Sequence, residues 1–105
     1  MEIKKLRQDY RLTVTNNSEV AVIYTIIIKN LPSGVKVGID DGTLQNQDAN
    51  NQVQFTNNSL YTLAASGANR SATHKLTFAA PLGTAEVTNQ GINVEVIFIQ
   101  KNPTT

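Results

Sequence analysis

Hydrophobic and polar residues alternate along most of this chain with a period of two residues, the period of a β-strand that buries one face. The alternating runs are short, and Gly, Pro, Asn, Asp or Ser residues separate them. No apolar repeat of 3.6 residues persists for the roughly 10 to 12 residues that a helix needs. The expected strands cover residues 6–15, 20–29, 35–39, 53–55, 60–64, 72–80 and 92–100.

The run from Val20 to Ile28 is apolar on both of its faces. Tyr24 and Ile26 share the side of Val20, whereas Ile27 lies on the reverse side. A strand of this kind is expected at the centre of a sheet, or with its outer face partly covered. With nine residues, the run is also well short of the roughly 20 that cross a bilayer as a helix.

Turns and loops punctuate the strands. Pro32 presets φ and Gly34 tolerates positive φ, so these residues predict a tight turn. Asn57-Asn58-Ser59 predicts a hairpin turn between the strands on either side of it. Residues 43–52 and 82–90 show no period, and we expect them to form exposed connections.

Seven or eight short strands with turn signals about every 8 to 12 residues are typical of an all-β fold. The pattern predicts an Ig-like or jelly-roll antiparallel β-sandwich. A chain of 105 residues is long enough for one hydrophobic core and one domain. We expect residues 10–100 to form the sandwich domain and residues 101–105 to form a C-terminal tail. Residues 1–9 form an N-terminal segment, either a first strand or a strand donated to another chain.

Composition narrows the classes of partner. The net charge is +1 and only 16% of residues are charged, which leaves no strong field for nucleic acid or a membrane surface. Polarity comes mainly from twelve Asn, seven Gln and twelve Thr, which suits an extracellular β-protein. The absence of Cys excludes disulfides and thiolate metal sites. We therefore expect no nucleic acid, no membrane insertion and no cofactor.

Catalytic chemistry has few candidate residues. His74 is the only histidine, so a Ser-His-Asp arrangement would have to be built around it. The alternation places His74 on the side of Leu76 and Phe78, which predicts an inward, hydrogen-bonded structural histidine. We expect no catalytic residue and no enzymatic activity.

Three aspartates are the only candidates for a metal site. Carboxylate oxygens are ligands that calcium prefers. The spacing of these residues matches neither an EF-hand nor an RTX loop, so we interpret them as turn residues and predict no metal site. The weak calcium candidates are Asp40, Asp41 and Asp48.

An open sandwich edge can accept a strand from another molecule through backbone hydrogen bonds. The segment Glu2–Tyr10 is the best donor candidate, because it precedes the patterned core and carries large apolar residues. The same segment also fits an ordinary first strand. The assembly candidates are Ile3, Leu6 and Tyr10.

A ligand-binding module is the alternative function. It would recognise a carbohydrate, or act as an adhesin, through the loops 43–52 and 82–90. Carbohydrate-binding sandwiches normally present exposed aromatic rings, and this chain has no Trp and three Tyr. An exposed Tyr61 near these loops would favour this alternative.

Three stretches carry a resemblance to a known group of proteins. They are TVTNNSEVAVIYTIIIKNLPSGVKV (13–37), LAASGANRSATHKLTFAAPLGT (63–84) and INVEVIFIQ (92–100). Together they resemble the Ig-like repeat modules of prokaryotic surface proteins, above all the camelysin/TasA-type biofilm-fibre and related surface proteins of Gram-positive bacteria.

The resemblance implies a sandwich fold, secretion and a structural role at the cell surface or in the biofilm matrix. Met1 is not followed by a signal peptide, so we expect the signal of an exported protein to be missing from this chain. We therefore expect a non-enzymatic extracellular structural or assembly module. Its partners would be further copies of itself or other surface proteins.

Overall fold

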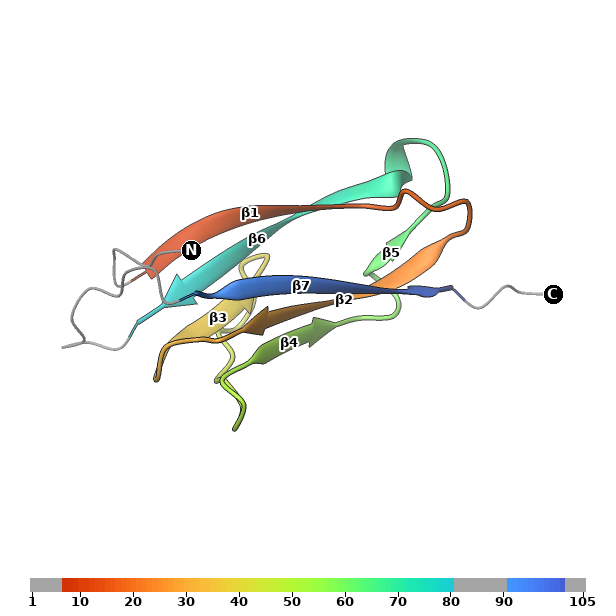
Figure 1. Ribbon diagram of the computed structural model, residues 1–105. Coiled ribbons are helices and arrows are strands. Elements are labelled where there is room, and N and C mark those ends of the chain that lie inside the picture. The colour runs from red at the N-terminus through yellow and green to blue at the C-terminus, as the bar shows by residue number, and fades with distance from the viewer. Residues whose placement is uncertain (1–6, 81–90, 102–105) are drawn as a thin grey trace.

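The computed structural model describes residues 7–80 and 91–101, which form two antiparallel sheets that face each other as an all-β sandwich (Figure 1). A short 3₁₀ turn, η1 (Ala68–Arg70), precedes one of the strands. The strands of the described residues are β1 (Arg7–Thr15), β2 (Val22–Lys29), β3 (Lys36–Ile39), β4 (Val53–Thr56), β5 (Thr62–Leu63), β6 (Ser71–Ala79) and β7 (Asn93–Gln100).

The first sheet has the strand order β1-β6-β3, and the second sheet is built around β2. Strand β7 pairs with the whole of β2 along one side. On the other side, β4 pairs with residues 25–28 of β2 and β5 pairs with residues 22–23. Figure 1 shows β2 between β7 and β4. The central position predicted for the doubly apolar run is thus confirmed.

The hydrophobic core lies between the two sheets. Inward side chains of β2 alternate with half-buried outward ones, and Ile26 and Ile28 have no exposed area. From the other sheet, β6 contributes Leu76 and Phe78, which are also almost completely buried. The predicted inner faces of these two strands are therefore confirmed. Val20 differs from the prediction, because β2 begins only at Val22 and Val20 lies 42% exposed in the preceding turn.

The turn at Pro32 and Gly34 is confirmed. The Val35 amide donates a hydrogen bond to the Pro32 carbonyl at 3.2 Å, and Gly34 has a φ of 83°. This turn leads the chain from β2 of the second sheet into β3 of the first.

The hairpin predicted at Asn57-Asn58-Ser59 is wrong. A turn does form, because the Asn57 side-chain oxygen accepts hydrogen bonds from the amides of Ser59 (3.1 Å) and Leu60 (3.0 Å). The strands on either side of it do not pair with each other, however, since both pair with β2. The following strand is also shorter than the expected 60–64, with only Thr62–Leu63 in β5.

The connection 43–52 was expected to be an exposed loop, but its first part is hydrogen-bonded to β3. Gln45 and Val37 exchange two backbone hydrogen bonds, of 3.1 and 2.8 Å, so the start of the loop adds to the edge of β3. The other predicted connection, 82–90, lies outside the described residues.

The core predicts a clear stability difference between buried and exposed apolar residues. Ile26→Ala or Phe78→Ala should lower the free energy of unfolding by about 2 to 5 kcal/mol, because both side chains are fully buried. Urea denaturation measures this loss. Leu60→Ala is the control, since Leu60 is 72% exposed and its loss should change stability by less than about 0.5 kcal/mol. Equal losses at Ile26 and Leu60 would contradict the packing described.

Candidate functional site

His74 stands at the centre of a hydrogen-bonded network of Asp40, His74 and Tyr24 that joins the two sheets, with His74 and Tyr24 buried and Asp40 exposed. Its Nδ1 lies 2.7 Å from Oδ2 of Asp40, and its Nε2 lies 2.5 Å from the hydroxyl of Tyr24. Tyr24 comes from β2, His74 from β6, and Asp40 from the turn after β3. The prediction of an inward, hydrogen-bonded His74 is confirmed.

The turn after β3 positions the Asp40 carboxylate beside His74. Asp40 and Asp41 have φ values of 51° and 62°, in the left-handed region that Asp tolerates better than most residues. The turn closes with a 2.9 Å hydrogen bond from the Gly42 amide to the Ile39 carbonyl. Oδ1 of Asp40 accepts a hydrogen bond from the Lys75 amide, which fixes the carboxylate beside His74.

The partners of His74 assign its tautomer. A carboxylate only accepts hydrogen bonds, so Nδ1 of His74 carries the proton and donates it to Asp40. With the proton on Nδ1 alone, Nε2 accepts the hydrogen bond from the Tyr24 hydroxyl. Both ring nitrogens of His74 are thus hydrogen-bonded. Among the described residues, no buried side-chain nitrogen or oxygen lacks a hydrogen-bond partner.

Two tyrosines enclose this histidine. Tyr61 stacks on Tyr24 at a centroid distance of 5.4 Å and meets the edge of the His74 ring at 5.1 Å. Burial, helped by the neighbouring Tyr61 and Asp40, raises the pKa of Tyr24 to about 12. Burial also raises the pKa of Tyr61. Near neutral pH the Tyr24 phenol stays protonated, and Tyr24 is 1% exposed, so the Asp40-His74-Tyr24 network links the two sheets from within the core.

The three aspartates proposed as calcium candidates do not share a site. Asp40 is engaged with His74, and Asp41 forms an ion pair with Lys75. Asp48 accepts hydrogen bonds from the amides of its own loop. Within the part of the chain that the structure describes, no three His, Cys, Asp or Glu residues lie close enough to hold a metal ion together.

The structure places the assembly candidate Tyr10 inside the first sheet. Tyr10 pairs with Leu76 in the β1–β6 ladder, and its ring meets Phe78 edge-on at 5.7 Å. The described part of the donor segment is thus a strand of its own domain. Ile3 and Leu6 lie outside the described residues.

The loop 43–52 uses its polar side chains to hold itself together. Gln47 donates hydrogen bonds to the carbonyls of Pro32 (2.7 Å) and Val35 (3.0 Å), and Asp48 caps the loop amides. Tyr61, which would have favoured carbohydrate binding if exposed, is only 9% exposed and packs in the core. Neither observation favours the ligand-binding alternative.

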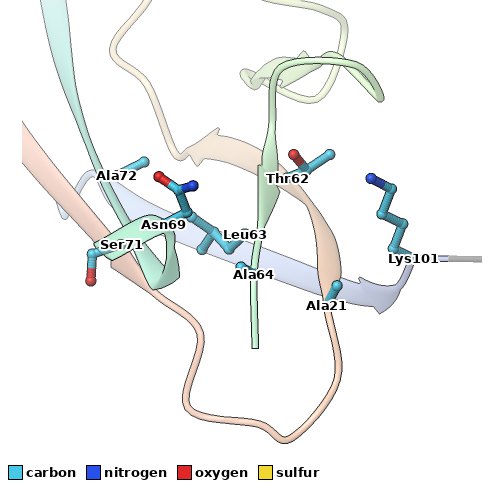
Figure 2. Close-up of a pocket in the computed structure, with 8 residues that line it drawn as sticks. All are labelled: Ala21, Thr62, Leu63, Ala64, Asn69, Ser71, Ala72 and Lys101. Atoms are coloured by element: carbon cyan, nitrogen blue, oxygen red, sulfur yellow. The ribbon is translucent and has the colours of Figure 1, made fainter. Parts of the chain in front are cut away.

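A hollow of about 370 Å³ lies at one end of the sandwich. In Figure 2, Lys101 rises beside Thr62 on one rim, across from Asn69, Ser71 and Ala72. The lining carries hydroxyl, amide and amino groups and small apolar side chains, without an aromatic ring or a carboxylate. This hollow therefore lacks the stacking surface of a sugar site and the paired groups of a catalytic site. It is completed by Ala21, Leu63 and Ala64.

Strand β7 presents a run of exposed apolar side chains. Ile97, Phe98 and Ile99 are consecutive, and their exposed fractions are 44%, 43% and 59%. Among residues 7–80 and 91–101, β7 pairs with β2 alone, so its other side is an edge of the second sheet. At one end of this strand, Glu95 forms a 3.0 Å ion pair with Lys29. We call this side of β7 the β7 edge.

The ladder fixes which backbone groups point to the β7 edge. The Lys101 amide donates a 2.9 Å hydrogen bond to the carbonyl of Ala21, so Lys101 faces β2. Successive residues of a strand direct their N–H and C=O groups to opposite sides. The backbone of Tyr24, which stands opposite Phe98, shows the same alternation. Its amide points away from β7 and donates a hydrogen bond to the Tyr61 carbonyl on the other side of β2. The residues whose backbone groups point to the β7 edge are therefore Val94, Val96, Phe98 and Gln100.

The side of β1 that faces away from β6 differs from the β7 edge. The outward side chains of β1 include Arg7, Asp9 and Arg11, and such charges discourage pairing with another molecule. The sequence did contain a signal for β7, since its last run is apolar on both faces at residues 97–99. Alternation within the run did not identify it as an edge strand.

No protein-family model, no curated protein and no solved structure matches this chain. Across the two described ranges, no helix has the length and apolar character required to cross a membrane. The functional argument therefore rests on the geometry of the described residues.

The buried Tyr24 phenol predicts that the protein loses stability at high pH. The folded state keeps the Tyr24 proton up to about pH 12, whereas the unfolded state loses its proton near the ordinary value of 10.0. The contribution of Tyr24 is therefore fully present below pH 10 and falls between pH 10 and 12. Melting temperatures across this interval should fall less steeply in Tyr24→Phe than in the parent.

The phenolate absorbance gives the second measurement. Tyr24→Phe should make the ionisation step near pH 12 smaller by one tyrosine in a titration of the folded chain, because only Tyr61, whose pKa is also raised, then remains of the buried pair. A parent and a variant that lose stability equally between pH 10 and 12, or a variant whose step near pH 12 is as large as that of the parent, would contradict the burial of this hydroxyl.

Proposed function

We propose that this chain is a non-enzymatic structural module of a bacterial cell surface or biofilm matrix, and that copies of it assemble through the β7 edge. The observation that carries the assembly is the eight-residue edge strand β7, with Ile97, Phe98 and Ile99 exposed along it. An exposed, long and apolar edge strand is a template for pairing with another strand.

Over residues 94–100 the β7 edge lacks the features with which proteins usually block such pairing, and Lys101 follows directly after this stretch. These features are Pro, Lys, bulges and inward-pointing charges. From Val94 to Gln100 the strand carries one charge, Glu95, and its register with β2 runs without a bulge. Pairing would satisfy the backbone groups of the edge and would remove the isoleucines from water.

The surface location and the finer fold type are parts of the same proposal. Asn, Gln and Thr supply most of the polarity of the chain, as in extracellular β-proteins. The resemblance to the Ig-like modules of prokaryotic surface proteins supports an Ig-like sandwich and a camelysin/TasA-type setting. The two antiparallel sheets are compatible with that fold type.

Lysine substitutions on the β7 edge test this function. The parent chain should associate as its concentration rises, whereas Ile97→Lys combined with Ile99→Lys should remain monomeric, because pairing would then bring cations together. Sedimentation velocity over a concentration series measures the association. Circular dichroism should show unchanged folding, since both side chains are exposed.

Leu60→Lys is the matched control. Leu60 is 72% exposed in the turn after β4, away from the β7 edge, and its substitution should leave the association unchanged. A parent chain that stays monomeric at the highest concentrations, or a double variant that associates like the parent, would rule out assembly through β7.

A further inference from the structure

The backbone of the β7 edge restricts how a second copy of the chain can bind there. In an antiparallel pair, opposite residues either exchange two hydrogen bonds or exchange none. The groups that point to the edge belong to the even-numbered residues Val94, Val96, Phe98 and Gln100. Two copies related by a two-fold axis must therefore place even residues opposite even residues. This condition places the axis at a residue and excludes an axis between two residues.

Among the registers that meet this condition, those that place at least five residues of 93–101 opposite the second copy have the axis at residue 95, 96, 97, 98 or 99. An axis at 95 brings two Glu95 carboxylates together. Axes at 96 and 97 place Glu95 opposite an isoleucine, and an axis at 99 places Ile97 opposite Lys101. Each of these four registers opposes like charges or leaves a charged side chain against an apolar one.

Of the five axes, the one at Phe98 matches the outer-face side chains throughout, and on the inner face it places Phe98 opposite Phe98 and Val96 opposite Gln100. It places Ile97 opposite Ile99 of the second copy, and Glu95 opposite Lys101 of the second copy. By symmetry each of these pairs occurs twice. Residues 95, 97, 99 and 101 share the outer face, so the apolar pairs lie between the two charge pairs.

We propose that two copies of this chain pair their β7 strands antiparallel about a two-fold axis at Phe98, with Glu95 of each copy opposite Lys101 of the other. The proposal rests on the function proposed above, and it specifies the partner and the register at the same edge.

The outer-face residues of the two copies form non-hydrogen-bonded cross-strand pairs, the type with the shorter Cα separation. Ile97 and Ile99 direct their backbone groups to β2, so across the new contact they form non-hydrogen-bonded pairs. In such pairs the Cα atoms are about 4.5 Å apart and the side chains are closest. Cross-strand contacts between β-branched residues and between opposite charges are both favourable, and like charges are not.

Glu95 can serve both of its lysines. One oxygen, Oε2, already lies 3.0 Å from Nζ of Lys29 in the same copy. A carboxylate accepts several hydrogen bonds, so Glu95 can also accept one from Lys101 of the second copy. Pairing requires the exposed Lys101 side chain to turn from the rim of the hollow in Figure 2 to the β7 edge. Glu95 and Lys29 are 46% and 35% exposed, so the existing pair leaves room for an approaching side chain.

On the inner face, the axis brings the two Phe98 rings together. Phe98 lies 6.3 Å from the ring of Tyr24, yet it is 43% exposed. It borders a hollow of about 230 Å³ beside the turn that begins at Asn16. A second Phe98 ring at this position shields the apolar side of both copies, and aromatic pairs of this kind are favourable.

The contact closes at two copies. A two-fold contact uses the same surface on both molecules and leaves no free β7 edge for a third. The dimer would extend the second sheet across both copies, with β7 beside β7 at its centre. The module thus joins two chains, and longer assemblies would require a different surface.

Introduced cysteines test the register, and the parent chain has none to interfere. Ile97→Cys and Ile99→Cys chains, one of them isotopically labelled, are mixed and oxidised, and mass spectrometry identifies the disulfide-linked pairs. We expect the mixed 97–99 pair to dominate, because its Cα separation of about 4.5 Å suits a disulfide. The 97–97 and 99–99 pairs would be about 7 to 8 Å apart, beyond the reach of a disulfide.

Charge exchange provides an independent test. Glu95→Lys alone and Lys101→Glu alone should each weaken dimerisation by about tenfold, because each places like charges opposite one another twice. An equimolar mixture of the two variants should restore dimerisation as a heterodimer. Lys36→Glu, an exposed residue of β3, is the control with the same change of charge as Lys101→Glu and should dimerise like the parent.

The outcomes separate the register from the assembly. A dimeric parent with dominant 97–97 disulfides, or with no recovery in the charge mixture, overturns the register and leaves assembly through β7 standing. A parent that is monomeric throughout overturns both.

Discussion

The burial of one face of β2 against β6 is the interaction on which the rest of the structure depends. Ile26 and Ile28 on β2 and Phe78 on β6 have no exposed area, so they hold the two sheets face to face. Because β2 is bonded along both of its sides, the remaining strands of its sheet take their places from it. Strands β4 and β5 divide one side of β2, and β7 covers the other. Among the described residues, β7 is therefore one edge of this sheet, and β4 and β5 form the other.

A second, polar interaction crosses the same interface. Tyr24 on β2 reaches His74 on β6, which in turn holds Asp40 after β3. A buried polar group is costly unless it is hydrogen-bonded. In this network Tyr24, His74 and Asp40 are all hydrogen-bonded. The arrangement contains the residue types of a catalytic relay, but burial of the tyrosine leaves it no access to a substrate. His74 therefore serves to join the two sheets. The exposed apolar side chains considered for assembly lie on β7.

Local alternation was sufficient to predict the inner faces of β2 and β6, including the inward position of His74, because the two-residue period depends only on neighbouring residues. Strand pairing depends on residues distant in the sequence, and here prediction failed. Asn57 forms its turn, yet the strands beside it both pair with β2 and form no hairpin. The same limit applies to edges. Tyr10 was an assembly candidate on a segment that also fits an ordinary first strand, and it pairs with β6, whereas Phe98 shares the parity of core residues and lies 43% exposed.

The central claim is that a second copy of the chain binds the β7 edge. Residue-resolved amide hydrogen exchange of the full chain, at dilute and at high concentration, tests it most directly. The amides of Val96, Phe98 and Gln100 point to the edge and should become protected only at high concentration, whereas those of Ile97 and Ile99 face β2 and should be protected at both. Exchange of the first three amides that does not depend on concentration would contradict the account.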